Sequence, residues 1–172
     1  LPFYFSGLIL ISIFYFLNKK EILKFDKLIL SYFFVLFFLI SLDIAVKLNL
    51  GWDAKWFWYI KSLYFFQNYD FSYLSQYEFN SFHPHFGSYL WAFFRELSLS
   101  KIEYSGRIFY AFLYLSSLFF LIDKFEKNKI QNFIIIFLLL LITYKYKLFS
   151  GLQEILIFSI LIIISKLIYE FI

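Results

Sequence analysis

Long apolar runs alternate with short charged connections along most of the chain. The first run covers residues 1–17, and the second extends from residue 28 to residue 46. Three further runs follow at residues 104–122, 130–144 and 154–172. Their lengths are close to the roughly 20 residues that a helix needs to cross the hydrocarbon core of a bilayer. The pattern therefore predicts five transmembrane helices.

Residues 49–104 contain no run long enough to cross a bilayer. Helical spacing of apolar residues instead predicts two amphipathic helices in this segment, at residues 53–66 and 86–97, with irregular chain between them. We expect both to lie in the membrane interface, where Trp and Tyr are favoured. The apolar positions of the first helix are Trp56, Tyr59, Ile60, Leu63 and Tyr64.

Lysine and arginine density indicates the orientation of the predicted helices. The connections at residues 18–27 and 123–129 hold four and three lysines, whereas the much longer segment 47–104 holds five lysines and arginines in total. Because cytoplasmic loops are enriched in these residues, the two short connections are predicted to be cytoplasmic. The segment 49–104 and the turn at residues 145–153 then lie on the outer side. Strict alternation of five spans gives the same assignment.

Composition agrees with a membrane protein. The chain is 62% hydrophobic and 27% aromatic with a mean hydropathy of +0.73, whereas soluble domains are roughly 45–50% apolar. The net charge of +4 includes no basic cluster, so nucleic-acid binding is not expected. The sequence thus predicts an all-α polytopic protein with one transmembrane domain over residues 1–172. Because the chain begins inside an apolar run and has no methionine, we expect it to be part of a longer protein.

Asp53 is the first candidate for chemistry. It follows the second predicted span and lies among Trp52, Trp56 and Trp58. A carboxylate is disfavoured at headgroup depth unless the fold holds it there. One interpretation is an N-terminal helix cap, a position that Asp fills well. The other is a general base that acts on a sugar or lipid hydroxyl, and a cap would also hold the carboxylate in place.

Glu154 is the second candidate, since it directly precedes the last apolar run. A carboxylate at the membrane boundary is costly if it faces lipid. It is either an acid of the first helical turn or a second carboxylate that faces the same outer cavity as Asp53. On the first amphipathic helix, Lys55 and Lys61 are expected to reach water by snorkelling.

Histidines and basic residues give two weaker signals. His83 and His85, with Glu78 upstream, could bind a divalent metal, although loop histidines without regular ligand spacing are more often structural. Arg107 and Lys61, on the outer side, could bind the phosphate of a lipid-linked substrate. The alternative for each cation is simple contact with lipid headgroups.

Three of these segments together resemble the GT-C class of integral membrane glycosyltransferases, in particular the bacterial lipopolysaccharide-core branch and the protein mannosyltransferases. Gly51-Trp52-Asp53-Ala54 is similar to the Asp of the first outer loop in that class. Phe82-His83-Pro84-His85-Phe86-Gly87 resembles its His-Pro-x-Tyr-Pro segment, but with Phe and Gly where Tyr and Pro are usual, and His85 where an acid is common. Ser150-Gly151-Leu152-Gln153-Glu154 resembles a later outer turn that precedes an apolar run.

The resemblance covers residues 28–165 and implies a GT-C-like enzyme of the bacterial inner membrane with a periplasmic active site. Such an enzyme moves a sugar from a polyprenyl-phosphate donor to a glycan, lipid or protein of the cell envelope. Asp53 would be the catalytic base, and basic residues or a divalent cation would hold the departing lipid phosphate. Substrate-binding residues would be Glu154, Arg107, Lys61, His83 and Trp56.

Two other classes remain alternatives to a transferase. One is a transporter, flippase or polysaccharide-polymerase component, and the other is a non-catalytic membrane subunit. Transport through the bilayer predicts polar residues along a path between the helices. The fourth and fifth predicted spans have almost none in their middles, which disfavours the first alternative.

Overall fold

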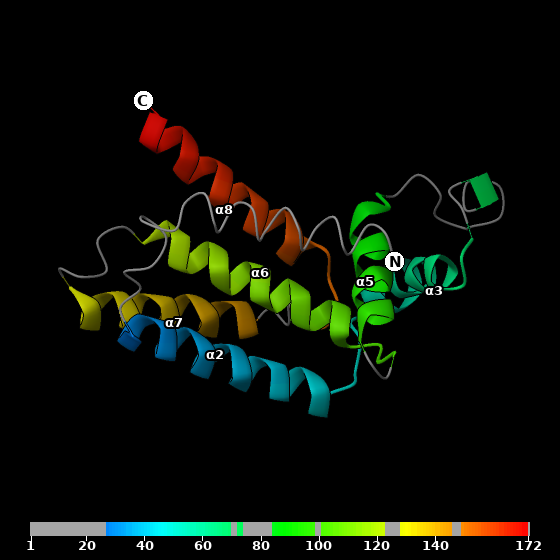
Figure 1. Ribbon diagram of the computed structural model, residues 1–172, viewed down its shortest axis with the longest axis horizontal. Helices are drawn as coiled ribbons and strands as arrows, with labels where there is room; N and C mark the ends of the chain where they lie inside the picture. The colour runs from blue at the N-terminus through cyan, green and yellow to red at the C-terminus, as the bar shows by residue number, and fades with distance from the viewer. Residues whose placement is uncertain are drawn as a thin grey trace, which may run out of the picture. The chain divides into compact units, whose positions relative to one another are not determined.

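Helices are the regular elements in all parts of the chain that the computed structural model describes (Figure 1). The first predicted span and most of the first connection lie outside these parts. The chain divides into two compact units between Tyr32 and Phe33, and the contacts below belong to the second unit. The described residues are 27–69, 72–73, 84–98, 101–122, 128–145 and 149–171.

The four later apolar runs form helices close to their predicted bounds. They are α2 (Lys27–Val46), α6 (Ser105–Leu121), α7 (Lys129–Lys145) and α8 (Glu154–Phe171). Both amphipathic helices are also present, the second as α5 (Phe86–Leu97) and the first as η1 (Ala54–Tyr59) followed directly by α3 (Ile60–Phe66).

One of the described helices, α2, is both long and apolar enough to cross a membrane. It has 20 residues, and the mean hydropathy of its most apolar window is 2.4. Only 11% of that window is buried, which distinguishes α2 from the core helix of a soluble domain. α6 is also apolar, but its 17 residues make it shorter.

α6 is the helix on which the others assemble. Rings of α2 contact it where Phe33 and Phe37 meet Phe112 edge-to-face, with centroids 5.8 and 5.6 Å apart. On α7, Thr143 forms a hydrogen bond of 2.6 Å with the hydroxyl of Tyr114. α8 packs along α6, and α5 contacts the first part of it (Figure 1). α6 is therefore in contact with α2, α5, α7 and α8, whereas η1 and α3 pack on α5.

The indole of Trp91, on α5, fills a narrow slot that two glycines make possible. A Cβ on Gly106 of α6 would lie 2.7 Å from the Trp91 Cα, and a Cβ on Gly151 would lie 2.7 Å from Cη2 at the far edge of the indole. Both separations are shorter than carbon atoms tolerate. Trp91 is completely buried, and its Nε1 donates a hydrogen bond of 2.9 Å to the carbonyl of Glu103. The slot thus joins α5, α6 and the turn before α8.

The residues that the first amphipathic helix buries in the protein lie outside its predicted apolar face. Its buried residues are Ala54, Lys61 and Ser62, while Trp56 is 51% exposed. The reason is that η1 is a π-helix, whose wider turn shifts the register of all later side chains relative to an α-helix. The expectation that Lys61 reaches water was therefore wrong. Its side chain is fully buried, and its Nζ lies 5.8 Å from the centre of the Trp58 ring.

Gly106→Ala tests the slot around Trp91. The added methyl group meets the backbone of α5, and overpacking of this kind costs about 1–3 kcal/mol. That loss should exceed the gain of about 1 kcal/mol that Gly→Ala brings in a helix, so we expect a lower free energy of unfolding. Denaturant unfolding in micelles, followed by tryptophan fluorescence, measures it. Ser116→Ala on the same helix is the control, and equal stability of Gly106→Ala and wild type would contradict the tight contact.

Candidate functional site

Three segments that are far apart in the sequence meet around Trp91, and we call their meeting point the junction. They are residues 50–54, residues 87–91 and residues 150–153. The amide of Gly51 donates a hydrogen bond of 2.9 Å to the carbonyl of Ser150. The junction therefore brings together the first and third stretches in which the sequence resembles GT-C enzymes, and Gly87, the last residue of the second.

Two further contacts tie the start of α5 to the turn before α8. The side-chain amide of Gln153 donates a hydrogen bond of 3.0 Å to the hydroxyl of Ser88. Gly87 lies against the same amide so closely that a Cβ there would be 2.4 Å from Gln153 Cδ. The hydroxyl of Tyr110 donates a hydrogen bond to the Gly87 carbonyl. This part of the junction is buried and is held by polar contacts with defined directions.

Asp53 lies at the surface of the junction. Its backbone is already helical, with φ −62° and ψ −39°, and its side chain makes no capping hydrogen bond, so the capping interpretation is not supported. The next residue, Ala54, is completely buried, with its Cβ 3.1 Å from the position of a Cβ on Gly151. Trp52 and Trp56 on either side are exposed. The fold thus anchors the backbone of this segment and leaves the Asp53 side chain exposed.

Glu154 is exposed and belongs to the first turn of α8. A carboxylate interacts favourably with the helix dipole at this position, which agrees with the interpretation as a first-turn acid. It directly follows Gln153 of the junction. The backbone segments that carry Asp53 and Glu154 are therefore in contact through the bond between Gly51 and Ser150.

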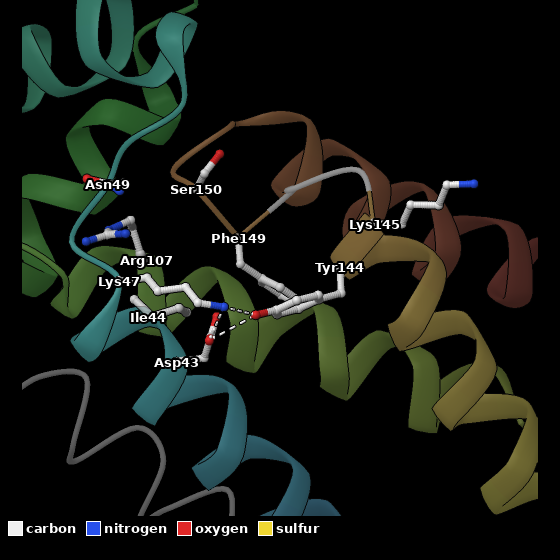
Figure 2. Close-up of a pocket in the computed structure, with 9 residues that line it drawn as sticks. All are labelled: Asp43, Ile44, Lys47, Asn49, Arg107, Tyr144, Lys145, Phe149 and Ser150. Carbon is white, nitrogen blue, oxygen red and sulfur yellow. Dashed lines mark hydrogen bonds and ion pairs between the residues drawn. The ribbon is translucent and has the colours of Figure 1, made fainter.

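A cavity of about 530 Å³ lies at the end of α2 (Figure 2). Its volume is in the range of small-molecule sites, about 300–1,000 Å³. It adjoins the junction because Ser150 belongs to both. Asp53, Glu154, Lys61 and Trp56 are not part of its lining. The lining residues are Asp43, Ile44, Lys47, Asn49, Arg107, Tyr144, Lys145, Phe149 and Ser150.

Arg107, predicted from the sequence as a phosphate ligand, is in the wall of this cavity. The residue is 2% exposed, and its Nη2 pairs with Oε2 of Glu103 at 3.1 Å. Among the described residues, neither Nε of Arg107 nor Oε1 of Glu103 has a hydrogen-bond partner. A buried polar atom without a partner costs about 1–3 kcal/mol. A ligand that supplied the missing hydrogen bond would recover that free energy.

A polar bridge links α2 to α7 at the cavity (Figure 2). The ammonium of Lys47 pairs with Oδ1 of Asp43 at 2.7 Å and also contacts the Tyr144 hydroxyl. That hydroxyl donates a hydrogen bond of 2.9 Å to the same carboxylate. These contacts, first with Asp43 and then with Tyr144, raise the pKa of Lys47 well above its ordinary range. The spacing of Asp43 and Lys47 suggested their pairing, whereas nothing local to Tyr144 indicated that it joins them.

The predicted metal site cannot be compared with the structure, because His83 and Glu78 lie outside the described residues. His85 is described, and its ring meets the edge of Phe65 with centroids 6.2 Å apart. Within the described parts of the chain, no group of three His, Cys, Asp or Glu side chains could hold a metal ion. Metal binding by the histidine segment stays a prediction.

The titration of Lys47 tests the polar bridge. Because its pKa is raised in the folded protein, the pairing stabilises the fold at all pH values below the ordinary lysine value of about 10.4, and is lost as the pH rises through the folded value. We expect Asp43→Asn to lower the midpoint pH of the Lys47 titration, and Tyr144→Phe to lower it less. NMR of protein with ¹³C-methylated lysines, followed at the signal of Lys47, measures this midpoint. Identical midpoints in wild type and Asp43→Asn would contradict the bridge.

Comparison of the chain with protein-family models, with curated proteins and with solved structures found no match. No activity of another protein is therefore transferred to this chain, and the resemblance to GT-C enzymes stays a prediction. The junction and the cavity are the basis on which a function can be proposed.

Proposed function

We propose that this chain is the membrane part of a GT-C-type glycosyltransferase that moves a sugar from a polyprenyl-phosphate donor to a cell-envelope acceptor. The observation that carries the proposal is the junction. Three short stretches resemble the same enzyme class, and they are well separated along the chain, at residues 51–54, 82–87 and 150–154. In the fold the first and third stretches are joined by a backbone hydrogen bond between Gly51 and Ser150, and Gly87, the last residue of the second, lies against Gln153 of the third. These contacts support the proposal.

In this proposal Asp53 is the general base. Its carboxylate accepts the proton of an acceptor hydroxyl while the hydroxyl oxygen attacks the anomeric carbon of the donor. The bond between that carbon and the phosphate oxygen breaks, and the lipid phosphate leaves with the electron pair. An exposed carboxylate on an anchored backbone suits this role, since the acceptor must reach it from outside the bilayer. Base catalysis of this kind typically contributes about 10²–10⁴ in rate.

The cavity is the proposed site of the donor phosphate. Its lining includes the cations Arg107, Lys47 and Lys145, of which Lys47 pairs with Asp43 and Arg107 with Glu103. Arg107 has an unused Nε donor in the described structure, and guanidinium groups bind phosphate oxygens well. Ser150 connects the cavity to the segment of Asp53. A phosphate in the cavity and an acceptor at Asp53 would therefore be neighbours.

Exposed apolar side chains support a polytopic arrangement with the active site on the outer, periplasmic side. Soluble monomers rarely expose apolar patches larger than a few hundred Å², yet α7 and α8 expose apolar residues along their length. At 1.5 Å per residue each is about 26 Å long, the short end of the range that spans a bilayer. The exposed residues are Ile130, Ile134, Phe137, Leu138, Leu141 and Ile142 on α7, and Ile157, Phe158, Leu161, Ile164, Leu167 and Ile168 on α8.

Asp53→Asn tests the catalytic role. The amide keeps the shape but cannot accept the proton, so we expect transfer to fall by about 10²–10⁴ at normal expression. The assay uses full-length protein in proteoliposomes, with radiolabelled polyprenyl-phosphate sugars tested one at a time and a cell-envelope glycan fraction as acceptor. Glu96→Gln, at an exposed acid of α5, is the matched control. Undiminished transfer by Asp53→Asn would remove the base role, and movement of donor across the bilayer without transfer would favour a flippase.

Cysteine accessibility tests the membrane arrangement, because the chain has no natural cysteine. Asn68 precedes α6 and Asn128 follows it, and both are exposed. If α6 spans the membrane, Asn68→Cys is labelled by an impermeant maleimide in intact cells, and Asn128→Cys only after permeabilisation. Labelling of both residues in intact cells would show that α6 does not cross, and α2 would then be the only membrane-length helix of the described chain.

A further inference from the structure

Three tyrosines cluster where α3 ends, and we call this cluster the tyrosine platform. The rings of Tyr69 and Tyr73 are stacked, with centroids 4.3 Å apart and an interplanar angle of 19°. The ring of Tyr64 meets both edge-on, at 5.7 and 5.8 Å. Tyr69 is 41% exposed, so a polar aromatic surface remains accessible although the three rings support one another.

The turn after α3 holds the platform in place. The amide of Tyr69 donates a hydrogen bond of 3.0 Å to the carbonyl of Tyr64, and the amide of Asn68 bonds to Phe65 at 3.1 Å. Asn68 has a φ of +67°, a left-handed conformation that Asn tolerates better than most residues. The side chains of Gln67 and Asn68 are exposed. Two residues with exposed carboxamides therefore directly precede the exposed Tyr69 in a turn whose backbone is fixed.

We propose that the tyrosine platform binds a pyranose ring of an extended glycan acceptor. A pyranose has faces lined with C–H bonds, and these pack against the electron-rich face of an aromatic ring. Its hydroxyl groups need partners that both donate and accept hydrogen bonds, which carboxamides and phenols can do. Gln67, Asn68 and the tyrosines carry no charge, as suits a neutral ligand. This inference rests on the proposed function, because it assigns a site to the acceptor of the same reaction.

The position of the platform indicates the length of that acceptor. Asp53 directly precedes the helical run of η1 and α3, Ala54–Phe66. Tyr64 lies in the last turn of that run, and Tyr69 and Tyr73 follow it. The seven residues of α3 alone extend about 10 Å at 1.5 Å each, and the six residues of η1 lengthen the run further. A sugar on the platform is thus remote from the hydroxyl that reacts at Asp53. The acceptor is therefore an oligosaccharide or polysaccharide that spans this distance, and a monosaccharide cannot occupy both places.

Tyr69→Ala in full-length protein tests the site with two acceptors, a long cell-envelope oligosaccharide and a monosaccharide glycoside. Loss of one aromatic stacking contact should raise KM for the long acceptor about ten-fold. We expect kcat for that acceptor, and both constants for the monosaccharide, to stay unchanged. Tyr69→Phe, which keeps the ring, should restore most of the affinity. Tyr169→Ala, at an exposed tyrosine of α8 outside the junction and the cavity, is the control and should leave both acceptors unaffected.

An unchanged KM for the long acceptor in Tyr69→Ala would overturn the inference, and so would an equal rise for both acceptors. Failure of wild type to transfer any sugar would instead count against the proposed function. In that case, saturation-transfer NMR with the oligosaccharide decides the inference independently. Saturation-transfer signals of the oligosaccharide that are present with wild type and vanish with Tyr69→Ala support the platform. Absence of these signals with wild type, or equal signals with the two proteins, overturns the inference.

Discussion

The fold of the later part of the chain depends on the slot that holds Trp91. A large indole can lie between α6 and the turn before α8 only because Gly106 and Gly151 leave room for it. The same ring contacts Tyr59 and Tyr110, with centroids 5.7 and 6.1 Å away. Interiors are close-packed, so each of these contacts constrains the others. Without the slot, α5 would have no fixed position against α6, and the junction would not form.

Buried cations are the second constraint. Arg107 and Lys166 are both almost fully buried, and each has a carboxylate four residues away on its own helix. Lys166 also lies over the ring of Phe120, 5.1 Å from its centre. A buried charge is tolerated when paired, and removal of its partner is expensive. The two cations differ in their surroundings. Arg107 lines the cavity, whereas Lys166 does not, and the Nε of Arg107 has no hydrogen-bond partner in the described structure.

The proposed reaction follows from where the fold places these groups. The junction brings the segment of Asp53 beside the turn that leads to Glu154, and Arg107, whose Nε has no hydrogen-bond partner in the described structure, lies in the wall of the cavity next to it. A membrane-bound phosphate donor and a water-borne acceptor would approach such a site from different directions. Exposed Trp52 and Trp56 suit the boundary between them, since indole rings favour the headgroup level. In the proposal, the tyrosine platform at the end of α3 holds a more distant sugar of the same acceptor.

Local pattern was enough to locate the helices. Hydrophobic runs and helical spacing predicted α5 at its observed bounds and α8 within one residue, because both depend on side chains that are neighbours along one helix. The pairing of Asp43 with Lys47 was also predictable, as they are four residues apart. The same reasoning failed for Lys61, because a π-helix changes the register and leaves no clear mark on composition.

By itself, then, the sequence determined the all-α class, the helix bounds and the chemistry available to Asp53 and Arg107. The tertiary structure alone decided that Tyr144 joins Asp43 across 101 residues, and that Trp91 is the centre of the junction. It also decided that Arg107 lies in a cavity wall while Lys61 is enclosed. The reason is physical: periodicity reports only the interactions within a helix, whereas a site is made by side chains from different helices, whose approach depends on the packing of the whole unit.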